Sequence, residues 1–71
     1  ELVIDSQIDA TLTLYWRDWV CDETPWTTMQ PSADLVQATT VGNVWVLRHD
    51  SGAYIDHFVV ETAPPPTWVV P

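Results

Sequence analysis

The sequence predicts an all-β domain, a small antiparallel β-sandwich with an extended, proline-rich C-terminal tail. The longest patterned segment alternates apolar and polar residues with a period of two, as a half-buried strand does. Turn-forming residues separate the apolar segments. No segment carries a helical apolar stripe with capping residues. We therefore expect one domain at residues 1–61, followed by a linker or docking tail at residues 62–71.

The first strands are expected near the N-terminal end of the sequence. Residues 2–4 have the composition of a short strand, and the pairing into the next strand is expected to begin at Ile8. Within residues 10–18, Leu12, Leu14 and Trp16 alternate with polar or amphipathic residues. Their side chains are expected to face one side of a half-buried strand.

The middle of the sequence predicts two short strands between turns. Asp22, Glu23 and Pro25 indicate a turn, and residues 26–29 a strand that ends at residues 30–32. Residues 35–40 are expected to form another strand.

A hairpin is expected to complete the sheet structure. The pair Gly42-Asn43 tolerates the positive φ of a tight turn and precedes a buried strand at residues 44–48. Residues 50–52, Asp-Ser-Gly, are a second turn signal, after which residues 54–61 return antiparallel.

The tail differs in composition from the rest of the chain. Successive prolines Pro64, Pro65 and Pro66 fix φ and remove donors, which favours a polyproline II segment. Residues 67–71 contain Trp68 and have a strand-like composition. Three interpretations stay open: they pair with an edge strand, they dock on a neighbouring molecule, or they begin a further domain.

Length, charge and cysteine count exclude several classes. A chain of 71 residues buries only roughly 60% of its unfolded surface, which disfavours a deep catalytic cleft. Ten acidic residues oppose only Arg17 and Arg48, for a net charge of −8. This balance disfavours nucleic acid and anionic membranes and favours neutral or basic partners. The single cysteine, Cys21, forms neither an internal disulfide nor a cysteine-rich zinc site.

No targeting signal is predicted from the sequence. The sequence contains no signal peptide and no apolar run of membrane-spanning length, so we expect it neither to span a membrane nor to carry its own address. The sequence does not specify a cellular location. An acidic, lysine-free domain with a proline-rich tail is typical of secreted modules, which favours an extracellular one.

Catalytic chemistry has little support in the sequence. His49 and His57, with Asp50 and Asp56 beside them, are the one candidate acid–base or metal site, but such residues are ordinary on a solvated hairpin. Cys21 precedes two acidic residues, an unfavourable setting for a thiolate nucleophile. We expect no enzyme activity, no cofactor and no metal.

Several segments together resemble the β domain of the von Hippel-Lindau protein family. The segments in order are Leu14-Tyr15-Trp16, Trp26-Thr27-Thr28-Met29, Val41-Gly42-Asn43-Val44-Trp45-Val46-Leu47-Arg48, Gly52 and Phe58-Val59. The resemblance covers about residues 4–61. It implies a seven- to eight-stranded β-sandwich that recognises a hydroxyproline-containing peptide laid along the sheet like an added strand.

The resemblance also implies a binding site. The apolar walls around the prolyl ring correspond to Trp16, Trp26 and Trp45, which we call the tryptophan cage; Trp26 replaces a tyrosine. The readers of the ring hydroxyl correspond to Thr39 and Asn43, which replace a serine and a histidine. Because an unpaired buried hydroxyl costs about 1–3 kcal/mol, this altered pair makes unmodified proline a candidate ligand beside hydroxyproline.

The family's role in protein degradation does not transfer to this chain. That role requires a helical domain, and these residues predict none. The proline-glycine turn of the family is also changed, since Pro31-Ser32 stands in its place.

Two hypotheses of different class follow. In the first, the domain is a non-catalytic module that binds a proline- or hydroxyproline-containing peptide through the cage. In the second, the domain is a structural subunit whose tail occupies a neighbouring copy and builds filaments. A simpler interpretation is that Trp16 and Trp45 are core residues.

Overall fold

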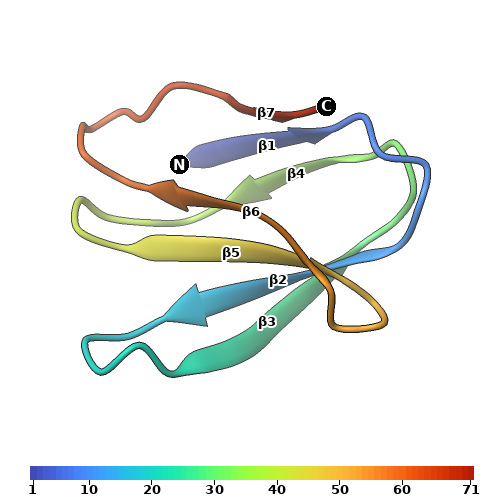
Figure 1. Ribbon diagram of the computed structural model, residues 1–71. Helices are drawn as coiled ribbons and strands as arrows, with labels where there is room; N and C mark the ends of the chain where they lie inside the picture. Colours follow the sequence, from blue (N-terminus) through green and yellow to red (C-terminus); the bar gives the residue numbers. More distant parts are fainter.

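Seven β-strands and no helix make up the protein in the computed structural model, which describes residues 1–71 (Figure 1). The strands are β1 (Leu2–Ser6), β2 (Leu12–Arg17), β3 (Glu23–Met29), β4 (Asp34–Gln37), β5 (Val44–His49), β6 (Tyr54–Val59) and β7 (Trp68–Val70). The all-β prediction is confirmed. No helix long enough to cross a membrane is present.

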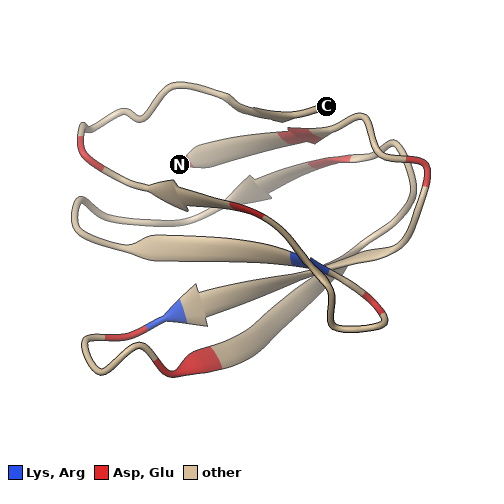
Figure 2. Cartoon of the chain, viewed as in Figure 1, with Lys and Arg blue, Asp and Glu red and all other residues tan.

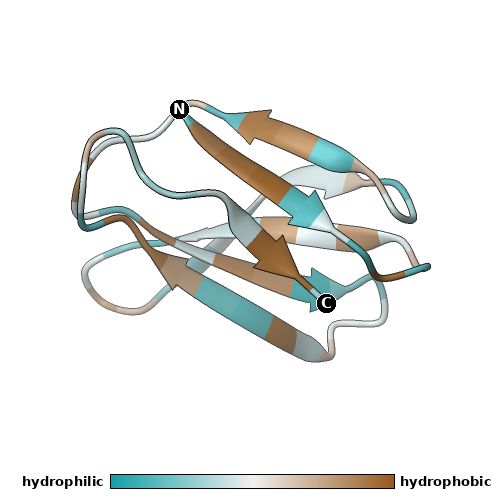
Figure 3. Cartoon of the chain, turned by 90° about the horizontal axis from the view of Figure 1, so that it is seen from above, coloured by the Kyte–Doolittle hydropathy of each residue, from teal (hydrophilic) through white to brown (hydrophobic).

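The strands form two sheets. One has the order β4-β1-β7 and the other β3-β2-β5-β6. All neighbouring strands are antiparallel except β1 and β7, which run parallel. Seen from above, the two sheets lie one over the other with the strand directions crossing (Figure 3).

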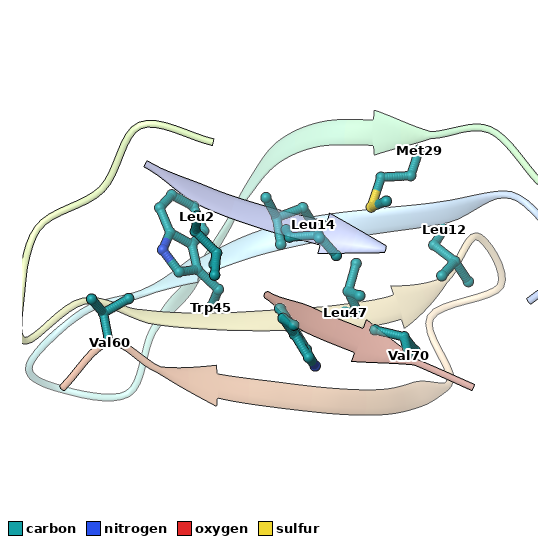
Figure 4. Packing of buried hydrophobic residues seen from close by; sticks show 10 residues of the cluster. Leu2, Leu12, Leu14, Met29, Trp45, Leu47, Val60 and Val70 are labelled. Carbon is teal, nitrogen blue, oxygen red and sulfur yellow. The ribbon is translucent and has the colours of Figure 1, made fainter. Parts of the chain in front are cut away.

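The core lies between the sheets. Leu12 and Leu14 are fully buried and Trp16 is partly buried, so the predicted alternation along β2 is confirmed. Figure 4 shows these leucines together with Leu2, Trp45 and other residues of the cluster. Its members are Leu2, Ile4, Leu12, Leu14, Met29, Trp45, Leu47, Val60, Trp68 and Val70. Both sheets contribute, so neither face is complete without the other.

The predicted turns around glycine are present. Gly42 and Gly52 both have φ of +98°, a conformation that glycine adopts without steric cost, and each stands two residues before the first residue of β5 or β6. Ser32, in the expected Pro31-Ser32 turn, has φ of +52°.

The turn predicted at residues 22–25 is wrong. β3 already begins at Glu23, and the turn lies earlier, at residues 18–22. Pro25 is tolerated because β3 is an edge strand with a bulge: Leu14 stands opposite Thr27 but Tyr15 opposite Pro25. Trp26 is the extra residue at this bulge.

Of the three interpretations of the final segment, pairing with an edge strand is the one that the structure shows, so residues 62–71 are not a separate tail. Trp68–Val70 forms β7 and pairs with β1, so that Ile4 stands opposite Trp68. The Trp68 ring lies 5.5 Å from that of Phe58, and its indole nitrogen donates a hydrogen bond to Asp56 at 3.1 Å. A boundary at residue 61 would therefore remove part of the core, because Trp68 and Val70 are both buried.

The connection from β6 to β7 contains the prolines. Residues 61–67 have neither helix nor strand, and they cross between the two sheets along one end of the molecule (Figure 1). Acidic residues are spread over strands and loops, whereas both arginines lie on the four-stranded sheet (Figure 2).

Candidate functional site

The three tryptophans of the cage come from three neighbouring strands. Trp16 on β2 stands directly opposite Trp45 on β5, so their side chains share one face of the sheet. Trp26 lies on β3, and its ring meets that of Trp45 at 5.8 Å with an interplanar angle of 72°. Edge-to-face packing of this kind is a favourable aromatic geometry.

Burial differs from one cage residue to the next. Trp45 is 2% exposed and belongs to the core, whereas Trp26 is 55% exposed. Trp16 is partly buried and packs against the core. The core interpretation therefore holds for Trp45, applies in part to Trp16, and does not account for Trp26.

Thr39 and Asn43 hold the indole rings in place. Trp45 Nε1 donates to Thr39 Oγ1 at 2.9 Å, and Trp16 Nε1 donates to Asn43 Oδ1 at 3.4 Å. Asn43 Nδ2 in turn donates to Thr39 Oγ1 at 3.0 Å. Both residues lie in the connection between β4 and β5. All five expected site residues are therefore joined in one cluster.

The hydrogen-bonding capacity left for a ligand is small. The Thr39 hydroxyl accepts two hydrogen bonds, which leaves its own proton as a donor. Asn43 keeps one amide proton and one lone pair. The two residues expected to read a ligand hydroxyl are thus already engaged with the cage walls.

Two hollows adjoin these residues. The first, of about 240 Å³, is lined by Trp16, Trp26, Ala38, Asn43 and Trp45. The second, of about 390 Å³, is lined by Trp16, Arg17, Asp18, Trp19, Thr40, Val41, Gly42, Asn43 and Val44. Trp16 and Asn43 belong to both, so the hollows adjoin along a common wall.

The expected docking residues of the tail lie elsewhere. None of Pro64, Pro65, Pro66 and Trp68 lines either hollow. The prolines are exposed or half-buried, and Trp68 is buried in the domain's own core. The structure does not bring the tail to the cage.

A charged network on the four-stranded sheet was missed from the sequence. Arg48 Nε and Nη2 donate to the two oxygens of Glu23 at 2.8 and 3.1 Å, and Arg17 Nη2 donates to the same carboxylate at 3.2 Å. The hydrogen bond from Arg48 is the main reason that the pKa of Glu23 is lowered. The sequence shows both arginines, but only the β3-β2-β5 strand order brings them to the same carboxylate, that of Glu23.

The histidine and aspartate residues of the hairpin do not form one site. His57 stands opposite Val46, three residues from His49, which is about 10 Å along a strand. His49 Nδ1 lies 3.1 Å from Asp50, and His57 Nδ1 lies 2.7 Å from the Tyr54 hydroxyl. No three His, Cys, Asp or Glu side chains are grouped so that they could hold a metal ion.

Comparisons with protein-family models, with curated proteins and with solved structures find no match to this chain. The resemblance to the von Hippel-Lindau β domain therefore stays a prediction.

Proposed function

We propose that this domain is a non-catalytic module that binds an extended peptide by enclosing one proline ring in the tryptophan cage. The observation that carries the proposal is the convergence of Trp16, Trp26, Asn43 and Trp45 around one solvent-accessible hollow. Thr39 does not line the hollow but is hydrogen-bonded to Asn43 and Trp45. Prolyl rings are typically recognised by aromatic-lined grooves, because the rigid ring loses little entropy when it packs on aromatic faces.

The size of the hollow suits one ring. Its volume of about 240 Å³ is below the range of about 300–1,000 Å³ typical of sites for drug-sized ligands. Trp26 is more than half exposed, so its ring offers apolar surface that a ligand would cover. Burial of that surface supplies the driving force for binding.

Unmodified proline and hydroxyproline are both candidate ligands of the cage. Both lone pairs of the Thr39 hydroxyl are taken by Trp45 and Asn43, so this oxygen has no lone pair left to accept the proton of a ligand hydroxyl. Asn43 keeps one amide proton and one lone pair, which can donate to and accept from a ligand hydroxyl. A hydroxyproline hydroxyl can therefore pair with Asn43 and leave the bonds between Thr39, Asn43 and the indoles intact, whereas a plain ring needs no such partner.

The charge of the chain restricts the peptide further. With a net charge of −8, the domain repels acidic peptides and attracts neutral or basic ones. The same balance disfavours nucleic acid and anionic lipid as partners.

The test is a titration with three acetylated and amidated peptides. They are Gly-Gly-Pro-Gly-Gly and the same sequence with hydroxyproline or alanine at the centre. We expect saturable binding of the proline and hydroxyproline peptides and none of the alanine peptide. Trp26→Ala is expected to weaken binding about tenfold or more, as loss of an aromatic wall predicts.

The matched control is Val36→Ala. Val36 is as exposed as Trp26 but lies on β4, in the other sheet. This variant should bind the proline peptide like the unchanged protein. Equal binding of the proline and alanine peptides would contradict the proposal.

A second candidate function, self-assembly through residues 62–71, is favoured by one observation. β7 is a three-residue edge strand that supplies Trp68 and Val70 to the core and follows a connection without regular structure. We propose that this assembly forms by exchange of β7 between copies. The contacts that β7 makes within one domain would then join two molecules.

The test of exchange is a covalent lock. Asp5 and Val69 are neighbours on β1 and β7, so cysteines at both positions, in a Cys21→Ser background, would hold β7 in its own domain. Sedimentation should show larger species for the unlocked protein at high concentration and a monomer for the locked one. A monomer at every concentration in both forms would contradict this second candidate.

A further inference from the structure

The turn between β2 and β3 presents two large apolar side chains to solvent. Trp19 is 98% exposed and Val20 is 74% exposed, the highest values among the large hydrophobic residues. Exposed apolar residues that gather in one place mark interaction sites more often than singly scattered ones do. This turn is therefore a candidate contact surface beside the cage.

The same turn is held by hydrogen bonds. Asp18 Oδ1 accepts from the backbone nitrogens of Val20 and Asp22, both at 3.0 Å. The Asp18 nitrogen donates to the Asp22 carbonyl at 3.0 Å, and the Cys21 nitrogen donates to the Asp18 carbonyl at 3.2 Å. These bonds fix the backbone that carries Trp19, so the indole is presented from an ordered turn at low entropic cost to a binding event.

A hollow lies between this turn and the turn that precedes β5. It is the larger of the two, about 390 Å³, and Trp19 and Val41 are among its walls. Val41 is itself 56% exposed. The hollow adjoins the cage, because Trp16 and Asn43 line both.

We propose that this second hollow binds a bulky apolar side chain of the same peptide whose proline occupies the cage. This inference rests on the proposed function, since it assigns the neighbouring position of one ligand. The two hollows share Trp16 and Asn43 as lining residues, so a peptide bound in the cage extends directly into the second hollow. The peptide is neutral or basic, because Asp18 is part of the wall and the chain carries a net charge of −8.

The spacing of the ligand follows from extended backbone geometry. Side chains two residues apart point to the same side of an extended peptide, about 7 Å from each other. The apolar residue is therefore two positions from the proline, on the side that runs toward Trp19. Both directions along the peptide are included in the test.

The test uses three acetylated and amidated pentapeptides. They are Gly-Gly-Pro-Gly-Gly, Leu-Gly-Pro-Gly-Gly and Gly-Gly-Pro-Gly-Leu, titrated into the full chain by NMR, which follows weak binding. We expect one leucine peptide to bind about tenfold or more tightly than the glycine parent, the gain that burial of a leucine side chain predicts.

Two variants test whether the gain in affinity from leucine arises in the second hollow. Trp19→Ala should remove the leucine gain and leave affinity for the parent peptide unchanged, because Trp19 does not line the cage hollow. Val36→Ala, on the other sheet, should keep both the gain and the parent affinity. Trp19 is almost fully exposed, so its replacement is not expected to unfold the domain.

Different results would overturn this inference and the proposed function. Binding of the parent peptide without any leucine gain, or a gain that survives Trp19→Ala, would overturn the second hollow and leave the proposed function standing. Failure of all three peptides to bind would overturn both. Self-association that Trp19→Ala abolishes would assign the exposed turn to a second copy of the chain and overturn this inference.

Discussion

The Thr39 hydroxyl accepts a hydrogen bond from the Trp45 indole at 2.9 Å, which ties the connection after β4 to the central strand β5. The same oxygen accepts from Asn43, which in turn holds Trp16. One hydroxyl therefore orients two walls of the cage, so that the cage is preorganised before any ligand arrives.

Replacement of Thr39 by valine should cost both stability and binding. The variant leaves the Trp45 and Asn43 donors without their acceptor, and an unsatisfied buried donor costs about 1–3 kcal/mol. Urea denaturation should therefore give a lower free energy of unfolding, and the proline peptide should bind more weakly. Thr39→Ser keeps the hydroxyl and should stay close to the unchanged protein; equal stability of the valine and serine variants would show that these bonds contribute nothing.

Much of the fold could be predicted from local patterns. The alternation along β2 and the glycines before β5 and β6 are signals that a few residues determine. The bulge at Trp26 could not be predicted, because it depends on how β3 pairs with β2. The sequence therefore predicts a turn at Pro25, although an edge strand with a bulge accepts proline.

The role of β7 also depends on distant residues. Trp68–Val70 could be recognised as strand-like, but its partner β1 lies at the other end of the sequence and pairs in parallel. Likewise, Thr39 and Asn43 could be named as site residues, but their bonds to the indoles depend on the folded positions of three segments. The ion pairs of Glu23 with Arg17 and Arg48 likewise depend on the order of the strands in the sheet.

Replacement of Trp68 by alanine should severely destabilise the domain. Truncation of a buried tryptophan costs about 3–5 kcal/mol, close to the whole stability of many small domains. Removal of residues 62–71 should have at least this effect, because it also removes Val70. Trp19→Ala provides the exposed comparison and should change the unfolding free energy by less than about 0.5 kcal/mol. Unchanged thermal unfolding after removal of residues 62–71 would contradict the place of β7 in the core.

Glu23 should stabilise the fold at neutral pH and lose that effect in acid. Its pKa is lowered from 4.5 in the folded protein, so its contribution is present above that value and is lost as the pH falls through the lowered, folded-state pKa. Glu23→Gln should lose about 1 kcal/mol of stability at pH 7, the upper range for ion pairs near the surface, with a smaller loss at acid pH. Glu61→Gln, at an exposed position, is the control; a loss for Glu23→Gln that does not depend on pH would contradict the ion-pair account.

Asp34 should have the opposite dependence on pH. The neighbouring carboxylate of Asp5, opposite it on β1, raises the pKa of Asp34 by a side-chain hydrogen bond and by charge repulsion. A raised carboxyl pKa stabilises the fold at low pH, and this stabilisation is lost as the pH rises through the folded-state pKa. Asp34→Asn should therefore raise the midpoint of thermal unfolding at pH 7 and have little effect at pH 3.

The control for that experiment is Asp9→Asn. Asp9 is exposed and makes no side-chain hydrogen bond in the structure. Its replacement should leave the unfolding midpoint nearly unchanged at both pH values. A destabilised Asp34→Asn variant at pH 7 would indicate that the two carboxylates are not in repulsive contact.

The most direct test of the cage is the response of its own indole N–H signals to a proline peptide. Addition of Gly-Gly-Pro-Gly-Gly should shift the NMR signals of Trp16, Trp26 and Trp45 along one saturable curve and leave Trp68, buried against Phe58, unmoved. Signals that stay in place at saturating peptide, or that move equally for the alanine peptide, would contradict the proposal that this domain binds proline.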